Sequence, residues 1–184
     1  MLEVRPTSLP SVLEVRPKRF ADERGFFSEV WNQASLASAG VDVAFVQDNH
    51  SLSRQAGVLR GLHYQLPPAE QYKLVRVTRG SVYDVAVDIR RSSPTFGQHV
   101  GLRLSVEEWN QLLIPPGFAH GFLTLEPDTE VQYKVSAPYS PADEACICWN
   151  DPALGIDWPL PVAEPVLSDR DRVAPPMAQA RLFG

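Results

Sequence analysis

The sequence contains little cysteine and no long apolar run. Its only cysteines, Cys146 and Cys148, are separated by a single residue. On a strand they would share one face, too cramped for a good disulfide and too few for a zinc site, so we expect them in the core. No apolar stretch is long enough to cross a bilayer, and the first residues lack the features of a signal peptide. We therefore expect a cytoplasmic location.

Clusters of basic residues are also missing. The 22 Asp and Glu residues outnumber the 17 Lys and Arg residues, which gives a formal net charge of -5. Nucleic-acid binding therefore has little electrostatic support. Hydrophobic residues make up 44% and charged residues 21% of the chain, a balance typical of folded rather than disordered proteins. We expect one domain over residues 1–184, because a chain of this length can bury a full core.

Long helices are not expected, because 17 prolines and 11 glycines are spread along the chain. Residues 33–39 are the best candidate for a short helix, ended by Gly40, and residues 105–109 could form one helical turn. Patterns typical of strands occur at residues 26–31, 45–50, 58–65, 73–78, 81–89, 97–104, 111–114, 121–125, 130–135 and 145–149. Many short strands separated by turns predict an all-β antiparallel sandwich or jelly roll. We expect the proline-rich tail from about residue 151 to wrap this barrel.

The most informative stretch runs from Val58 to Gln65 and is followed, ten residues after His63, by Lys73. It would place an imidazole, the guanidinium of Arg60 and an ammonium group on two neighbouring strands. Imidazole can accept and return a proton near neutral pH. A guanidinium suits phosphate oxygens. A base beside an anion-binding group indicates an active site, although a single half-buried strand histidine is more often structural.

Two short motifs resemble the signatures of the cupin superfamily, one from Gly57 to Gln65 and one from Pro115 to His120. In metal-binding cupins the first motif usually carries two histidines. Here Gln65 replaces the second, and a neutral amide is a poor ligand for the transition metals that imidazole suits. His63, His120 and Glu70 could still hold a metal, which keeps a metal-dependent oxygenase as a weaker alternative. We expect neither a metal nor a cofactor.

Longer segments resemble the dTDP-4-dehydrorhamnose 3,5-epimerase family of bacterial deoxysugar synthesis. They lie between about residue 20 and residue 171, and they comprise Phe20–Glu29, Gln47–Asn49, Arg60–Gln65, Gln71–Val75, Asp84–Arg90, Ser93–Gly97, Pro115–Phe122, and Leu167–Ser168 with Asp171. The resemblance implies a cofactor-free cupin-type barrel, usually a homodimer. It also implies dTDP-4-dehydro-6-deoxy-D-glucose as the substrate.

The chemistry of this substrate explains the residue types. Protons beside the 4-ketone are acidic only because their removal gives an enolate. Inversion therefore needs a base, an acid on the opposite face and a positive group at the ketone oxygen. We expect His63 to be the base, and the resemblance places Asp171, or alternatively Asp169, on its far nitrogen. Lys73 is the expected enolate stabiliser, and Tyr133 matches the acid of the family.

The nucleotide end of the substrate calls for cations and amides. Arg24 and Arg60 are candidates for the diphosphate, because a guanidinium can bind two oxygens at once, and the resemblance adds Arg170. Gln47 and Asn49 could pair with a base edge or the ribose. The other candidates are Glu29, His120, Glu144 and Tyr139, the last of which could assist the second protonation. Phe20 and Phe27 could stack on thymine, although we expect at least one of them in the core.

Several alternatives stay open. Close relatives of the family invert only carbon 3 or only carbon 5 with much the same residues. A 3,4-ketoisomerase on the same barrel would move the carbonyl, and a silent sugar-nucleotide binder should have lost His63 or Tyr133, both of which are present. Lys73 could be a solvated strand lysine and Tyr133 a core residue. However, Val75 and Val77 indicate that Lys73 faces inward.

Overall fold

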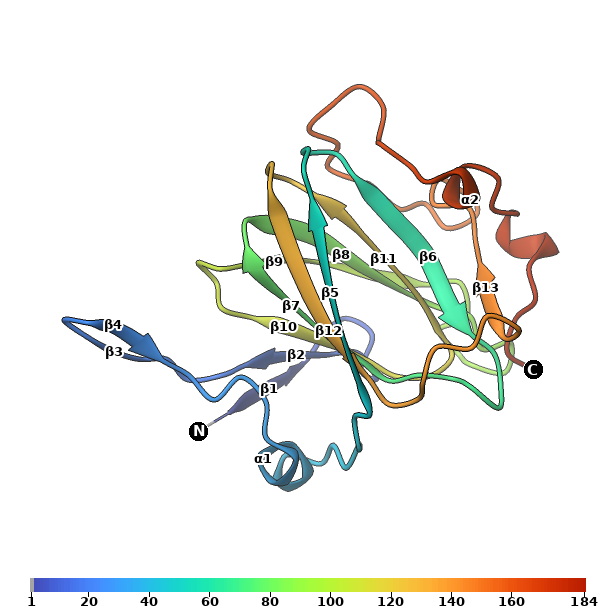
Figure 1. Ribbon diagram of the computed structural model, residues 1–184. Helices are drawn as coiled ribbons and strands as arrows, with labels where there is room; N and C mark the ends of the chain where they lie inside the picture. The colour runs from blue at the N-terminus through green and yellow to red at the C-terminus, as the bar shows by residue number, and fades with distance from the viewer. Residues whose placement is uncertain (1) are drawn as a thin grey trace.

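Two packed antiparallel sheets form the body of the molecule, which a computed structural model describes over residues 2–184 (Figure 1). The six-stranded sheet has the order β1 (Glu3–Pro6), β2 (Leu13–Arg16), β10 (Gln111–Ile114), β7 (Lys73–Arg79), β12 (Thr129–Val135) and β5 (Gln47–Ser53). The five-stranded sheet has the order β13 (Glu144–Cys146), β6 (Leu59–Gln65), β11 (Phe118–Thr124), β8 (Ser81–Asp88) and β9 (His99–Ser105). The arrangement confirms the predicted all-β, cupin-type jelly roll.

The core lies between the two sheets, because alternate residues of each strand turn toward the opposite sheet. Val75 and Val77 of β7 and Val131 of β12 pack with Ala86 of β8 in one buried cluster. Lys73 belongs to the same inward row as these two valines, and only 9% of it is exposed. The prediction that Lys73 faces inward is therefore confirmed.

The chain after residue 151 covers the outer face of the five-stranded sheet. Its Trp158 and Met177 are buried in a cluster with residues of β6 and β8. Tyr64 of β6 fastens the tail, because its hydroxyl donates a hydrogen bond of 2.5 Å to the carbonyl of Arg181. The tail contains the short helix α2 (Asp169–Arg172), which lies against β6, and a 3-10 helix, η1 (Met177–Gln179). It thereby brings polar residues of α2 to the inner edge of this sheet.

Helix α1 (Gln33–Ser38) covers part of the outer face of the six-stranded sheet. Leu36 of this helix is buried with Val15 and Leu74 of the sheet. The side chain of Asn32 caps the helix by accepting a hydrogen bond from the backbone N–H of Ser35 at 3.1 Å. Gly40 follows with a positive φ of 89°, as expected just beyond a helix end. The predicted helix is therefore confirmed. No helix in residues 2–184 is both long and apolar enough to span a membrane.

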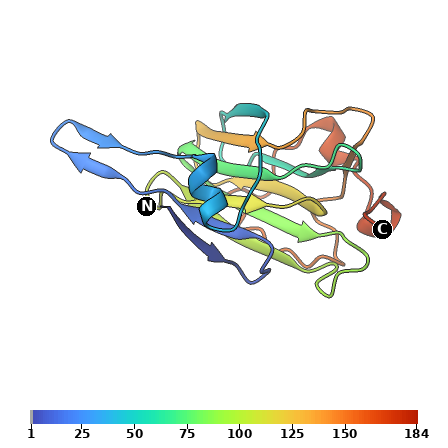
Figure 2. The ribbon, with the colours of Figure 1, turned by 90° about the horizontal axis from the view of Figure 1, so that it is seen from below.

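A separate hairpin, β3 (Phe20–Asp22) with β4 (Gly25–Phe27), extends away from both sheets (Figures 1 and 2). We call residues 20–27 the arm. Phe20 is 52% and Phe27 70% exposed, so the expectation that at least one of them lies in the core is wrong for the single chain. The base of the arm is held by Trp109, whose ring lies edge-on to Phe26 at 4.8 Å and whose indole N–H donates to Ser28 Oγ at 3.1 Å.

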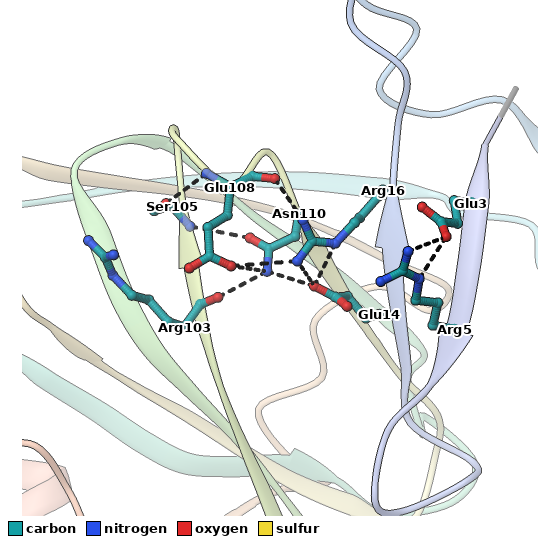
Figure 3. Close-up of polar contacts among 8 residues, drawn as sticks. All are labelled: Glu3, Arg5, Glu14, Arg16, Arg103, Ser105, Glu108 and Asn110. Carbon is teal, nitrogen blue, oxygen red and sulfur yellow. Dashed lines mark hydrogen bonds and ion pairs between the residues drawn. The ribbon is translucent and has the colours of Figure 1, made fainter.

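A polar network fixes the loop that carries Trp109 (Figure 3). Glu14 Oε1 on β2 accepts hydrogen bonds from Asn110 Nδ2 at 2.9 Å and from Arg16 Nη2 at 2.7 Å. Asn110 Nδ2 also donates to the carbonyl of Arg103 on β9 at 3.0 Å. The network thus joins β2, β9 and the loop between β9 and β10 beside the arm.

Several local expectations differ from the structure. Strands β1 and β2 were not predicted, and the strand predicted at 26–31 ends at Phe27. Residues 106–109 form the single turn expected there, closed by a hydrogen bond from the N–H of Trp109 to the carbonyl of Ser105 at 3.1 Å. Strand β13 ends at Cys146, and beyond it the N–H of Cys148 donates to the carbonyl of Pro175 in the tail at 2.8 Å. Both cysteines are partly exposed, so their placement in the core is wrong.

Candidate active site

Two adjoining cavities lie between the sheets, and both are lined by His63, Lys73 and Tyr133. The larger has a volume of about 500 Å³, and its other polar lining residues are Ser51, Arg60, His120, Ser168, Arg170 and Asp171. We call it the Arg60 cavity. The smaller, the Tyr139 cavity, has a volume of about 320 Å³, and its other polar lining residues are Gln47, Asn49, Tyr64, Gln65, Gln71, Tyr139 and Glu144. Most of the predicted site residues therefore meet around three shared side chains.

The imidazole and the phenol come from opposite walls. His63 lies on β6 of the five-stranded sheet, whereas Tyr133 lies on β12 of the six-stranded sheet. Lys73 of β7 reaches across, since its ammonium donates a hydrogen bond to the backbone carbonyl of His63 at 3.2 Å. A flat group held between the sheets would therefore have a base on one side, a phenol on the other and a cation at its edge.

A carboxylate of the tail orients His63. Asp171 is 3% exposed, and its Oδ1 lies 2.5 Å from His63 Nε2. Because an ionised carboxylate can only accept, Nε2 carries the hydrogen and Nδ1 is left as the basic nitrogen. Burial tends to raise the pKa of Asp171, but hydrogen bonds from His63 and Ser168 hold this pKa below its usual value. Of the two acids considered from the sequence, Asp171 rather than Asp169 makes this contact.

Helix α2 positions this carboxylate. Ser168 caps the helix, because its hydroxyl accepts a hydrogen bond from the backbone N–H of Asp171 at 3.1 Å. The cap residue and the carboxylate therefore both line the Arg60 cavity. Because a serine cap stabilises the first turn of a helix, it also limits the movement of Asp171 relative to His63.

Lys73 is a buried cation. Burial lowers its pKa to about 8, and the negative charges of Asp84 and Glu144 limit this fall. At neutral pH the side chain is thus mostly protonated, while little water surrounds it to compete for its hydrogen bonds. Such a preorganised cation can stabilise an oxyanion more strongly than a solvated one.

Burial has the opposite effect on the phenol. It raises the pKa of Tyr133, so this side chain keeps its proton across the neutral range and can serve as an acid. Beside it in the cavity, His120 donates from Nε2 to both oxygens of Asp84, at 2.9 and 3.0 Å. Burial lowers the pKa of His120, and the adjacent Asp84 carboxylate opposes this effect. His120 is therefore held in one orientation at the cavity wall.

The rim of the Tyr139 cavity is a second polar cluster. The hydroxyl of Tyr139 donates to Glu144 Oε2 at 2.6 Å, and its backbone N–H donates to Gln47 Oε1 at 3.0 Å. Arg170 forms an ion pair with the same glutamate. Burial would raise the pKa of Glu144, but Tyr139 and Arg170 hold it below its usual value. The cluster thus links α2, β13 and β5 around the cavity mouth.

Comparison with known proteins supports the resemblance seen in the sequence. The family model for dTDP-4-dehydrorhamnose 3,5-epimerase matches residues 6–179. The chain belongs to this family. It is 54% identical over 177 residues to the Pseudomonas aeruginosa enzyme of that name, with 96% of each chain covered. It is 53% identical over 183 residues to the Salmonella typhimurium enzyme, with 99% of each chain covered.

A solved structure agrees with this assignment. The 3,5-epimerase from Legionella pneumophila, in complex with dTDP-4-keto-L-rhamnose, has a TM-score of 0.93 to this chain and 45% identity, with 97% of this chain and 94% of that chain covered. The chain is therefore an epimerase of the isomerase class, as the sequence predicted.

Two predicted site residues of the epimerase lie outside the cavities of its own chain. Arg24 is at the tip of the arm, where it pairs with Asp22 at 2.6 Å and its side chain is 85% exposed. Glu29 accepts a hydrogen bond from Asn32 Nδ2 at 3.1 Å, just before α1. Neither lines the Arg60 cavity or the Tyr139 cavity. Their contact with substrate stays a prediction.

The residues considered for a metal do not form a cluster. Within residues 2–184, no group of three or more His, Cys, Asp or Glu side chains is arranged to hold a metal ion. His63 and His120 each contact a different carboxylate, and Glu70 lines neither cavity. The imidazoles are thus arranged as two separate carboxylate–histidine pairs.

Several epimerase residues in or beside the cavities were not among the predicted ones. Tyr64, Gln65 and Gln71 line the Tyr139 cavity, Ser51 and Ser168 line the Arg60 cavity, and Asp84 contacts His120. Asp84 carried a signal, because it is a charged residue in the apolar row of a buried strand and is 0% exposed. For Ser168, the signal was the spacing from a serine to a short acidic stretch, which is typical of a helix cap. Ser51 carried no comparable signal.

Proposed function

We propose that the chain inverts carbon 3 and carbon 5 of dTDP-4-dehydro-6-deoxy-D-glucose, with His63 as the base and Tyr133 as the acid. One observation carries this assignment: the two side chains line the same cavities from opposite sheets, and Lys73 lines both cavities with them. The geometry matches a reaction that removes a proton from one face of a sugar and returns one to the other.

The first step breaks a C–H bond beside the ketone. His63 Nδ1 takes the proton, the bonding electrons form the carbon–carbon double bond of an enolate, and the carbonyl π electrons move to the ketone oxygen. The ammonium of Lys73 stabilises this oxygen as negative charge develops. Asp171 in turn stabilises the imidazolium through the 2.5 Å hydrogen bond.

The second step restores the ketone with inverted configuration. Tyr133 donates its phenolic proton to the same carbon from the opposite face. The C=C electrons form the new C–H bond, and a lone pair of the enolate oxygen restores the C=O bond. His63 then releases its proton to solvent and Tyr133 regains one, so the enzyme is unchanged. Repetition at the other carbon gives the doubly inverted product.

Charged and polar groups around His63, Lys73 and Tyr133 can bind the diphosphate and the nucleoside of the substrate. Arg60 and Arg170 line one cavity and supply positive charge for the diphosphate. We assign the remaining polar candidates to the sugar, the ribose and the base edge, and these are His120, Gln47, Asn49, Tyr139 and Glu144. Because nucleotide sugars are made in the cytoplasm, we also propose a cytoplasmic location, which cell fractionation would test.

Proton exchange in heavy water tests the reaction directly. With the keto-sugar nucleotide in D₂O, NMR should show deuterium at both carbon 3 and carbon 5. Deuterium at carbon 3 alone would support the mono-epimerase alternative, and a product with its ketone at carbon 3 would support the ketoisomerase. His63→Ala should abolish exchange at both carbons while dTDP binding stays nearly unchanged.

We further propose that the active unit is a homodimer in which the arm of each chain completes the site of its partner. Support comes from the exposed phenylalanines of the arm and from the position of Arg24, which is predicted to bind substrate yet lies outside the cavities of its own chain. Sedimentation equilibrium would test the dimer.

Mixed dimers would test the exchange of arms. Arg24→Ala and His63→Ala chains should each be impaired alone. If the arm acts on the partner, one site of each mixed dimer regains both residues, so an equal mixture should recover about a quarter of wild-type activity. No recovery after verified subunit mixing would show that Arg24 does not act across the dimer.

A further inference from the structure

One face of strand β5 carries a row of polar side chains, three of which line the cavities. Alternate residues of a strand share a face, and this row consists of Gln47, Asn49, Ser51 and Ser53. Gln47 Nε2 donates to Asn49 Oδ1 at 2.9 Å, and Arg60 Nη2 donates to Ser53 Oγ at 3.5 Å. Three members of the row therefore have polar partners within the chain.

Ser51 is different. It lines the Arg60 cavity, yet its hydroxyl is shielded from bulk solvent and has no hydrogen-bond partner within residues 2–184. Its neighbour across the strand pair is Val131, which offers no polar side chain. Buried hydroxyls are normally hydrogen-bonded, so an unpartnered one at a cavity wall indicates a group that is completed by a ligand.

The strand register places Ser51 along the cavity. Asn49 is paired with Tyr133, and the next inward residue, Ser51, is one step further along β5. The step after that is Ser53, which Arg60 contacts. Ser51 is therefore located between the phenol expected at the reacting sugar and the guanidinium expected at the diphosphate.

We propose that Ser51 is a positioning residue whose hydroxyl donates a hydrogen bond to the phosphate attached to the sugar. The inference rests on the proposed function, because it takes the sugar to lie between His63 and Tyr133 and the diphosphate to lie at Arg60. A hydroxyl can donate to an anionic oxygen, and such bonds are stronger than those between neutral groups. The bond would fix the spacing between the diphosphate and the carbon that reacts.

Affinities for two nucleotides test this assignment. dTDP carries the second phosphate, whereas dTMP lacks it, so calorimetry on Ser51→Ala should show about 10-fold weaker dTDP binding and unchanged dTMP binding. The KM for the keto-sugar nucleotide should rise by about the same factor. Ser51→Thr and Ser51→Val form a matched pair, since they differ only in a hydroxyl and a methyl group. The threonine variant should bind dTDP more tightly than the valine variant, with equal dTMP affinity.

The variant Arg60→Ala distinguishes a failure of the Ser51 contact from a failure of the proposed diphosphate position. Weaker dTDP binding in Arg60→Ala, with unchanged dTDP binding in Ser51→Ala, would overturn the role of Ser51 and leave the placement of the diphosphate intact. Unchanged dTDP binding in both variants would overturn both. Equal losses of dTDP and dTMP affinity in Ser51→Ala, or equal dTDP affinities of the Thr and Val variants, would also reject the contact.

Discussion

Lys73 and Tyr133 show how one environment can prepare two side chains for opposite tasks. Burial lowers the pKa of Lys73 to about 8 and raises the pKa of Tyr133. The amine can therefore lose its charge within reach of neutral pH, whereas the phenol retains its proton. Neither state could be predicted from residue type, because both depend on water being excluded by the opposite sheet.

The charge on Lys73 should be visible in the pH dependence of the reaction. Because the enolate needs the ammonium form, kcat/KM should fall as pH rises through about 8. Asp84 raises the pKa of Lys73, so Asp84→Asn should move this fall to lower pH. Rates measured between about pH 6 and 10 would test both statements. A rate that stays constant up to about pH 10 would exclude Lys73 as the enolate stabiliser.

Asp88 is a buried carboxylate with a structural role. It accepts hydrogen bonds from Arg90 at 2.7 and 2.9 Å, and from Ser93 and Thr95 at 2.6 Å each. Burial would raise its pKa, but these donors bring it from 3.8 down to about 2. A folded-state pKa below the unfolded one stabilises the protein at pH values above the unfolded pKa. The contribution is lost as the pH falls through about 2.

Asp88→Asn should therefore lower the free energy of unfolding at pH 7 by about 2 kcal/mol. Urea denaturation of both proteins at neutral and at acid pH would measure this difference. The gap should narrow near pH 2, because about half of the Asp88 carboxyl groups are then protonated in the folded wild type as well. An equal difference in unfolding free energy at both pH values would show that the charge of Asp88 does not cause the stabilisation.

At the scale of elements, the sequence predicted those strands that carry their own pattern. Strand β10 occupies the predicted residues 111–114, and α1 was found from its flanking glycine. Strands β1 and β2 are only four residues each, β1 ends at Pro6 and Pro17 follows β2, so their alternation is too short to recognise. The arm has a clear apolar pattern, but this pattern predicts burial where the structure shows exposure. Its phenylalanines look like core residues, yet they are exposed on the single chain, which is consistent with the proposed contact with a second chain.

Trp109 should control the arm without contacting substrate. It packs on Phe26 and bonds to Ser28, and its φ of 55° lies in the region that glycine tolerates best. Trp109→Gly should therefore release the arm while leaving the local backbone intact, and we expect the dimer dissociation constant to rise about 10-fold or more. Sedimentation equilibrium would measure it. Ser28→Ala, which removes only the hydrogen bond, should have a smaller effect, and equal dissociation constants for Trp109→Gly and wild type would refute the clamp.

At the scale of the whole molecule, the site depends on contacts between distant parts of the chain. His63 and Asp171 are 108 residues apart, and β6 and β12 belong to different sheets. No periodicity could bring them together, so their grouping came from the family resemblance. The inward face of Lys73 could be derived from its valine neighbours. In contrast, the Asp84–His120 pair could be found only in the structure, because residues 36 positions apart leave no local pattern in the sequence. The unpartnered hydroxyl of Ser51 was likewise visible only in the structure.

The tail should have two separable roles, one in covering the sheet and one in catalysis. A chain ending at residue 166 loses Met177 from the buried cluster, the Arg181 carbonyl that Tyr64 contacts, and Asp171. Because apolar surface of the sheet is then uncovered, we expect a lower urea midpoint and stronger binding of a hydrophobic dye.

The variant Asp171→Asn tests the catalytic role of the tail separately from its role in covering the five-stranded sheet. The amide keeps the size of the side chain and the tail in place, so the urea midpoint should stay close to that of the wild type. It cannot stabilise the imidazolium as a carboxylate does, and kcat should fall by about 100-fold or more. Full activity in this variant would remove Asp171 from the mechanism. A truncated chain with the wild-type midpoint would instead show that the tail does not stabilise the sheet, and it would leave catalysis as the only role of the tail.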